Sequence, residues 1–263
     1  MLDFSNITFL IPFSNNVPQR LNNLKYILYF FEQQEYLSQC NFMICESVYQ
    51  STQSVTTDLL KNFNLNIRYF LIQQEDVYFN KCKCLNIMLN KSTTEYVVAH
   101  DVDCICAEIQ YIQAYEKLLT RTVSIVHPFN QHVINIPIKN GDEIYAHYAD
   151  LKWFNRYPPW QHKILAPGGS VFMHKEDYLI AGAENEMFKG YAPEDTERNV
   201  RFEKMGFKAA RIAGEIYHFM HDRTITASES NPLKVRNMLI YSKVLGMNKI
   251  QLENSIKIKF KNL

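Results

Sequence analysis

The stretch YVVAHDVD at residues 96–103 joins an apolar run to two carboxylates, Asp101 and Asp103. Residues 96–100 predict a buried β-strand, because short apolar runs rich in β-branched residues are typical of sheet cores. Two carboxylates so close together repel each other unless water, a proton or a cation compensates their charge. Oxygen ligands of this kind suit Mg²⁺ or Mn²⁺. An Asx-type turn that closes the strand is the alternative and, for this motif alone, an equally good interpretation.

Similar apolar runs occur along the first half of the chain, at Ile7–Phe13, Phe42–Cys45, Ile67–Ile72 and Val123–Val126. Between them, apolar residues recur at i, i+3 and i+4 in the segments 21–31 and 82–89, which predicts two amphipathic helices. This alternation predicts an α/β fold in which helices cover a parallel sheet. Ligands bind beyond the carboxyl ends of the strands in such sheets, so the site is expected just after Phe13, Ile72 and His100.

The composition excludes several classes of protein. Hydrophobic residues make up 47% of the 263-residue chain and charged residues 21%, so the chain is neither disordered nor fibrous. The 28 Lys and Arg nearly balance the 27 Asp and Glu, and the formal charge of +1 predicts no nucleic-acid partner. The apolar run near the N-terminus fits neither a signal peptide nor a membrane span, and the six cysteines match no zinc-ribbon spacing. We expect buried thiols in a cytoplasmic protein.

Two histidines three residues apart lie in the segment EIYHFMHD at residues 215–222. Imidazoles at this spacing can face one cation where the backbone turns, although single histidines are usually surface or core groups. Together with the strand-end carboxylates they supply the mixed oxygen and nitrogen ligands that Mn²⁺ accepts. We therefore predict Asp103, His218 and His221 as metal ligands.

Glycines and acids lie between these two motifs. Gly168 and Gly169 precede a β-rich run, where paired glycines allow a ligand to approach the backbone closely. The turn at residues 190–193 leads into Glu194 and Asp195 at the start of a predicted helix. Acids are favoured in a first helical turn by the helix dipole alone, but the position of these two beside a turn also suits a general base in a pocket.

These blocks resemble the β-1,4-galactosyltransferases, a family of inverting GT-A glycosyltransferases. The similar segments follow the family's order from about residue 7 to residue 223: IPF at 11–13, FNKCKCLN at 79–86, DVD at 101–103, GGS at 168–170, GYAPED at 190–195 and HFMHDR at 218–223. The resemblance implies a GT-A fold, with a Rossmann-like nucleotide-binding sheet that carries helices on both faces. It also implies transfer of a hexose or N-acetylhexosamine from a UDP-sugar, with UDP-Gal or UDP-GalNAc favoured, to a hydroxyl of a glycan or lipid-linked glycan acceptor.

The resemblance further implies roles for individual residues. Asp195 is expected to be the catalytic base and Glu194 to hold substrate hydroxyls. Asp103, His218 and His221 are expected to bind Mn²⁺, with Mg²⁺ as the alternative. The residues expected to bind the donor are Pro12, Phe13, Arg20, Phe79, Asn80, Lys81, Asp101, Val102, Ala166, Gly168, Gly169 and Tyr191.

The chain also departs from the family pattern. Ser14 and Asn16 stand where the family has basic residues, so we expect Arg20 or a residue elsewhere in the chain to contact the diphosphate in their place. Ala166 replaces a larger side chain near C2 of the donor sugar, which leaves room for an N-acetyl group. His218 occupies a position that is often methionine, which predicts broader metal tolerance.

We expect one GT-A domain at residues 1–230, with a nucleotide-sugar half at about 1–106, an acceptor and metal half at about 107–230, and an irregular excursion at 128–159. The basic segment 231–263 predicts a packed helix with a solvated basic face. Contact with an anionic membrane, at the inner face, is the alternative for this segment. The composition and the resemblance suggest a bacterial enzyme of surface polysaccharide synthesis.

Two other function classes use the same residues. A metal-dependent phosphohydrolase could employ Asp101, Asp103 and the histidine pair, but it would need a second metal or an activated water. A carbohydrate-binding protein without turnover would keep the aromatic residues and would not need Asp195.

Overall fold

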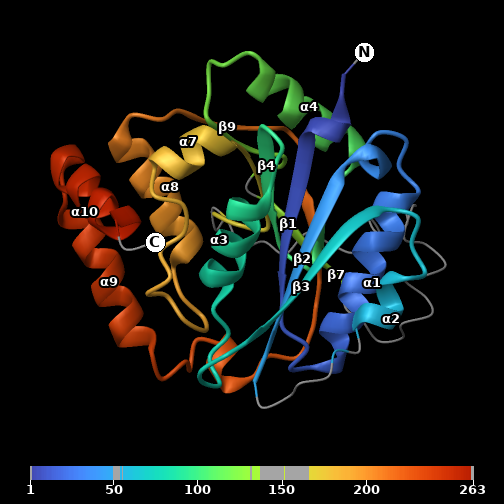
Figure 1. Ribbon diagram of the computed structural model, residues 1–263, viewed down its shortest axis with the longest axis horizontal. Coiled ribbons are helices and arrows are strands. Elements are labelled where there is room, and N and C mark those ends of the chain that lie inside the picture. The colour runs from blue at the N-terminus through green and yellow to red at the C-terminus, as the bar shows by residue number, and fades with distance from the viewer. Residues whose placement is uncertain are drawn as a thin grey trace.

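A computed structural model of the protein describes residues 2–49, 54, 56–130, 132–136, 151 and 166–261. Most of the excursion expected at 128–159 therefore lies outside the described residues. The described chain forms one large sheet, one small sheet and helices packed around them (Figure 1).

The large sheet has seven strands in the order β3-β2-β1-β4-β8-β6-β9. Their bounds are β1 (Ile7–Phe13), β2 (Asn41–Val48), β3 (Asn66–Gln73), β4 (Tyr96–His100), β6 (Ile125–His127), β8 (Ser170–His174) and β9 (Ala209–Arg211). The first four strands in this order are parallel, as are β6 and β9. β8 is antiparallel to both β4 and β6, so the predicted strands β1, β2, β3, β4 and β6 are parallel to one another and β8 is an antiparallel strand among them.

The reversed strand β8 brings the paired glycines to the carboxyl end of the sheet. Ser170 pairs with His100, so the segment that precedes β8 lies beside the residues that follow β4. The amide of Asp101 donates a hydrogen bond to the carbonyl of Gly169 at 2.8 Å. β4 ends at this edge of the sheet, whereas an antiparallel neighbour begins there. The residues just before β8, Gly168 and Gly169, therefore lie next to Asp101, which follows β4.

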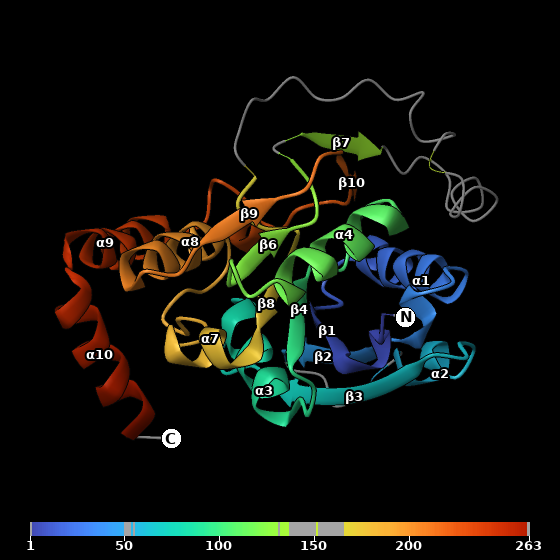
Figure 2. The same cartoon turned by 90° about the horizontal axis from the view of Figure 1, so that it is seen from above.

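Helices cover both faces of the large sheet, as expected. The bounds are α1 (Pro18–Glu32), α2 (Thr56–Leu60), α3 (Lys81–Lys91), α4 (Glu108–Leu119), α7 (Lys175–Ile180), α8 (Glu194–Met205), α9 (Lys234–Gly246) and α10 (Lys249–Lys261), with short 3₁₀ turns at Phe4–Asn6, Leu37–Gln39 and Ile225–Ala227. Buried side chains of α1 and α4 pack on one face, and those of α3, α7 and α8 pack on the other (Figure 2). The GT-A type of α/β fold that the sequence predicts has this arrangement.

A small sheet brings together segments that are far apart in the sequence. Its strands are β5 (Cys104–Ile105), β10 (Ile216–Phe219) and β7 (Val133–Ile136), with β10 in the middle. The amide of Phe219 donates to the carbonyl of Asp103 at 2.8 Å, and His218 pairs with Cys104 in register. This sheet therefore places the His-containing segment directly beside the Asp-x-Asp motif.

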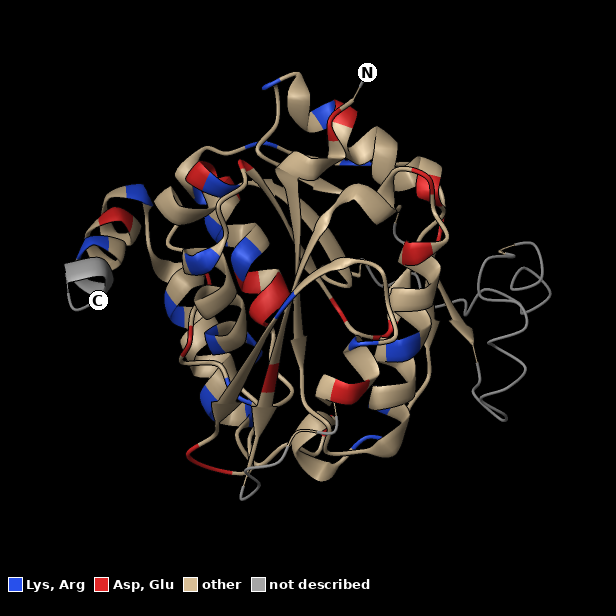
Figure 3. Ribbon diagram, turned by 45° about the vertical axis from the view of Figure 1, so that its right-hand side comes forward, with Lys and Arg blue, Asp and Glu red and all other residues tan. Residues whose placement is uncertain are grey.

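The C-terminal segment packs on the rest of the fold. Ile240, Val244 and Leu252 are buried, and the Lys204 ammonium donates to the carbonyls of Leu245 and Met247 at 2.8 and 2.9 Å. Acidic and basic residues are interspersed over the described ribbon (Figure 3). Within the described ranges, no helix has both the length and the apolarity that a membrane crossing requires.

Candidate active site

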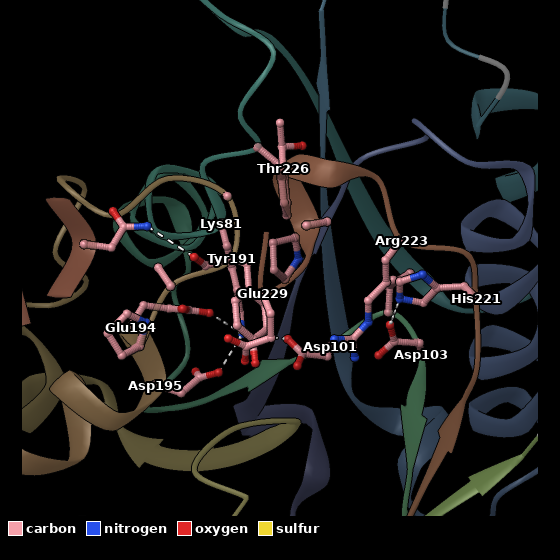
Figure 4. A pocket seen from close by; sticks show the side chains of 18 of the residues that line it. Lys81, Asp101, Asp103, Tyr191, Glu194, Asp195, His221, Arg223, Thr226 and Glu229 are labelled. Carbon is pink, nitrogen blue, oxygen red and sulfur yellow. Dashed lines mark hydrogen bonds and ion pairs between the residues drawn. The ribbon is translucent and has the colours of Figure 1, made fainter. Parts of the chain in front are cut away.

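A cavity of about 580 Å³ lies at the carboxyl end of β1 and β4. Most residues predicted for the site line this cavity, and they are Pro12, Arg20, Phe79, Lys81, Asp101, Val102, Asp103, Tyr191, Glu194, Asp195, His218 and His221. Figure 4 shows Glu194 and Asp195 toward one end, Asp103 and His221 toward the other, and Lys81 and Asp101 between them. The topology therefore gathers residues from five of the six quoted sequence blocks, together with Arg20, around one space.

Other predicted donor-binding residues lie away from the cavity. Phe13 is fully buried in the main core, where it cannot contact a ligand. Asn80 caps α3, because its side chain accepts a hydrogen bond from the Lys83 amide at 2.9 Å. Ala166 packs against the main core, and its carbonyl accepts from Arg211 at 3.1 Å. The hypothesis that Ala166 sets the space near C2 of the donor thus has no support from this geometry.

The paired glycines lie behind the site. A Cβ atom on Gly168 would sit 2.0 Å from Oδ2 of Asp195, so only glycine allows the Asp195 carboxylate to occupy its position. Gly169 has a φ of 99°, which a residue with a side chain rarely adopts. Gly168 therefore leaves room for the Asp195 carboxylate, and the donor-binding role expected of both glycines stays a prediction.

One end of the cavity holds the predicted metal ligands. Asp103 Oδ2 lies 3.0 Å from His221 Nε2 and 3.8 Å from His218 Nε2, and one ligand atom from each residue lies within 4.8 Å of the others. His218 Nδ1 hydrogen-bonds to Oδ1 of Asn135 and His221 Nδ1 to the carbonyl of Asp222, each at 2.7 Å. Such bonds hold the Nδ1 proton, so the Nε2 atom of each ring is the one that faces the Asp103 carboxylate. The donor set therefore fits a divalent cation.

Electrostatics favour the metal-binding forms of Asp103 and His218. Burial acts to raise the pKa of Asp103, but the hydrogen bond from His221 and the nearby His218 and Arg20 outweigh it and hold that pKa far below its usual value. Burial lowers the pKa of His218. At neutral pH the cluster thus presents a carboxylate and a neutral imidazole at His218.

The other end of the cavity is organised around Lys81. Its ammonium lies 2.9 Å from Asp101 Oδ1, 3.0 Å from Asp195 Oδ2 and 3.4 Å from Glu194 Oε1. The Asn80 cap places Lys81 at the first position of α3, from which its side chain reaches all three acids. From the sequence, Lys81 was expected to bind the nucleotide of the donor. Its position among these three carboxylates could not be predicted, because it depends on contacts between segments that are distant in the sequence.

The adjacent acids Glu194 and Asp195 have opposite proton affinities. Burial, together with the charge of Asp195, raises the pKa of Glu194 to about 8. Burial also acts to raise the pKa of Asp195, but Lys81 and Arg198 outweigh it and hold that pKa well below its usual value. Around pH 7, Glu194 therefore carries a proton while Asp195 is a carboxylate.

Two guanidinium groups add positive charge to the cavity. Arg20 and Arg223 line it, and neither forms an ion pair with a residue in the described part of the chain. Arg20 Nε is buried without a hydrogen-bond partner there, and burial lowers the pKa of Arg20. The Arg223 guanidinium lies 5.9 Å from the centre of the Tyr191 ring. The role of Arg223 went unassigned in the sequence, although it ends the quoted block at 218–223.

The C-terminal segment contributes to the cavity wall, which the sequence did not indicate. Lys234, Asn237 and Met238 of α9 line the cavity. The Asn237 side chain also donates to the carbonyls of Lys189 and Tyr191, at 2.9 and 3.2 Å. Segment 231–263 is therefore attached to the loop that carries Tyr191.

Solved structures with a similar fold are glycosyltransferases. A mannosyltransferase from Pyrobaculum calidifontis, in complex with GDP-Man and Mn²⁺, aligns with a TM-score of 0.58 and 15% identity over 97% of this chain and 68% of that chain. The catalytic domain of Drosophila β1,4-galactosyltransferase 7, in complex with xylobiose, aligns with a TM-score of 0.49 and 15% identity over 82% of this chain and 71% of that chain. No family model and no curated protein matches the sequence. The first alignment confirms the GT-A fold.

Proposed function

We propose that this protein is a metal-dependent inverting glycosyltransferase that moves a hexose or N-acetylhexosamine from a UDP-sugar to an acceptor hydroxyl. The observation that carries the proposal is the content of one cavity in a GT-A fold. At one end, the carboxylate of Asp103 and two imidazoles are arranged so that they could bind one metal ion. At the other end, the pKa of Glu194 is raised and that of Asp195 is lowered. Such a division suits a reaction that needs both an electrophilic and a basic group.

Asp103, His218 and His221 would hold Mn²⁺, with Mg²⁺ as the alternative. A divalent ion bound there would offset the diphosphate charge and stabilise the departing UDP. Arg20 and Arg223 form no direct ion pair with an acid in the described chain and line the same space, so they would contact the remaining phosphate oxygens. Arg20 thus supplies the cation that the sequence lacks at Ser14 and Asn16.

Asp195 would act as the base. The acceptor hydroxyl oxygen forms a bond to C1 of the sugar as its proton passes to the Asp195 carboxylate. The bond between C1 and the phosphate oxygen breaks, and UDP leaves with the electron pair. Attack from the face opposite UDP inverts the configuration at C1. Glu194, protonated at neutral pH, would donate a hydrogen bond to a substrate hydroxyl.

The finer assignments extend this proposal. UDP-Gal and UDP-GalNAc are the favoured donors, and a glycan or lipid-linked glycan of a bacterial surface polysaccharide is the favoured acceptor. Both rest on the resemblance to the β-1,4-galactosyltransferases. A cytoplasmic location, with contact of the basic segment 231–263 to an anionic membrane, would bring such an acceptor to the cavity, because residues of α9 line it.

A donor and acceptor screen tests the proposal. The protein would be incubated with Mn²⁺ and UDP-Gal, UDP-GalNAc, UDP-Glc or UDP-GlcNAc, with and without a panel of glycans, and UDP and glycosylated products would be quantified. We expect UDP release that increases with acceptor and a product heavier by one sugar. Release of inorganic phosphate would instead support a phosphohydrolase, and sugar binding without turnover would support a carbohydrate-binding protein. The variant Asp195→Asn is the matched control, because it should bind donor without transfer.

A further inference from the structure

Arg198 connects Asp195 to a second buried acid that does not line the cavity. Arg198 Nη2 lies 2.7 Å from Asp195 Oδ1, and Arg198 Nη1 lies 2.7 Å from Glu184 Oε1. The side chains of Arg198 and Glu184 are 1% and 0% exposed. Arg198 therefore cannot touch a substrate, and any effect that it has on chemistry passes through Asp195.

Glu184 is itself fixed on several sides. The Tyr178 hydroxyl donates to Glu184 Oε1. The Asn86 side chain accepts from the Glu184 amide at 2.8 Å and donates to the Glu184 carbonyl at 3.0 Å. Asn86, on helix α3, thus fixes the backbone of Glu184. A fixed acid gives the Arg198 guanidinium one orientation, because its planar fork bridges two carboxylates.

We propose that Arg198, anchored by Glu184, is a positioning residue that fixes the Asp195 carboxylate in the orientation from which it accepts the acceptor proton. This inference rests on the proposed function. Each Asp195 oxygen has its own cation, Arg198 on Oδ1 and Lys81 on Oδ2, and the missing side chain of Gly168 leaves the carboxylate room on its third side. Lys81 is shared with Asp101 and Glu194, whereas Arg198 serves Asp195 alone within the cavity.

The charges around Asp195 show what removal of Arg198 would change. The titratable and charged groups that face Asp195 from α3, α8, β6 and the end of β4 are Lys81, Arg198, Glu194, His127 and Asp101. Arg198 is one of two cations that favour the ionised form of Asp195. Loss of that cation should raise the pKa of Asp195, so the acid limb of the activity profile should move to higher pH.

The test removes the ion pair of Arg198 and Glu184, called the clamp below, without leaving either of its charges buried and unpaired. In Glu184→Gln/Arg198→Gln both members of the ion pair become neutral, whereas Arg198→Gln alone would leave Glu184 unpaired and could unfold the protein. A matched control exists on the same helix. Glu197 and Arg201 form a buried ion pair with Arg201 Nε 2.8 Å from Glu197 Oε1, and neither residue contacts Asp195. Glu197→Gln/Arg201→Gln therefore reports the cost of losing such a pair away from the base.

Two readouts separate positioning from a structural role. The first is kcat and the donor KM as functions of pH for wild type and both pair variants. The second is the titration of the Asp195 carboxyl carbon by ¹³C NMR, assigned with Asp195→Asn, which needs no activity. For Glu184→Gln/Arg198→Gln we expect kcat to fall about 10- to 100-fold with little change in KM, and both the acid limb and the NMR midpoint to rise. The control should keep the wild-type midpoint.

The outcomes distinguish this inference from the proposed function. A wild-type midpoint and wild-type kcat in Glu184→Gln/Arg198→Gln, or equal losses in both pair variants, would overturn the positioning role. A raised midpoint together with a wild type that transfers no sugar would support the clamp on Asp195 and refute the transferase.

Discussion

The two ends of the cavity hold charge in different ways. The cluster of Asp103, His218 and His221 has one carboxylate and two imidazoles, and its coordinating atoms point at one another with room for a cation. The cluster around Lys81 contains its own cation and compensates its carboxylates internally. The first arrangement is suited to recruiting a metal, and the second to holding a proton on one acid and not on its neighbour. Substitutions at the metal end should therefore impair metal binding, and substitutions at the Lys81 end should impair proton transfer.

The largest effect is expected at the metal end. Asp103→Ala removes the only carboxylate of the described ligand cluster, so the diphosphate charge would be poorly compensated. A loss of several kcal/mol of charge stabilisation corresponds to a fall in rate of about 10³-fold or more. Initial rates of sugar transfer at fixed Mn²⁺ measure it, with thermal unfolding as the control for folding. Wild-type rates in this variant, or full wild-type activity in excess EDTA, would remove the metal from the account.

At the acidic end, Asp195→Asn should lower kcat by about 10²–10⁴-fold, because an amide cannot accept the acceptor proton. Its donor KM should stay near the wild-type value, since the group is not assigned to donor binding. Steady-state kinetics with varied donor measure both constants. Retained turnover would mean that another group is the base, and Glu194 would be the next candidate.

A smaller effect is expected from Asn135, which orients the metal ligand His218. Asn135→Ala removes the acceptor that holds Nδ1 of His218, and loss of such an outer partner weakens metal affinity by about 10–100-fold. Mn²⁺ titration of activity gives the apparent affinity. In a His218→Met background, which should change metal preference without abolishing activity, the Asn135→Ala change should have no further effect. An additive loss would show that Asn135 acts elsewhere.

The smallest effect concerns stability and pH. Burial, with help from the charge of Asp195, raises the pKa of Glu194 to about 8, above its ordinary value of 4.5 in an unfolded chain. The folded protein holds a proton that the unfolded chain releases, so this contribution is complete below pH 4.5 and is lost as pH rises to about 8. The Tm of wild type should fall by a few degrees between about pH 6 and pH 9, and it should fall less in Glu194→Gln. Equal slopes would show that Glu194 titrates normally.

Local sequence patterns predicted the elements but not their long-range contacts. The bounds of β1 and β4 match the apolar runs at Ile7–Phe13 and Tyr96–His100, because burial on both faces leaves an uninterrupted apolar signal. The reversal of β8 was missed, since strand direction depends on where the chain re-enters the sheet. Pairing of side chains across distant segments has no local signal either.

The site shows the same division. The ligand types at Asp103, His218 and His221 were recognisable because metal chemistry restricts which side chains can serve. The ion pairs of Lys81 and the clamp at Arg198 were not, because a basic residue in a helix usually faces solvent. The donor-binding role of Ala166 stays a prediction, because a small apolar residue gives no local sign of whether it faces a cavity or the core.

The central claim is that one end of the cavity binds the nucleotide through a metal while the other moves a proton. Calorimetric titration of UDP into wild type, Asp103→Ala and Asp195→Asn, each with and without Mn²⁺, tests it most directly. We expect Mn²⁺-dependent UDP binding of equal affinity in wild type and Asp195→Asn, and loss of that binding in Asp103→Ala. UDP binding to wild type that is independent of Mn²⁺, or equal loss of binding in both variants, would contradict it.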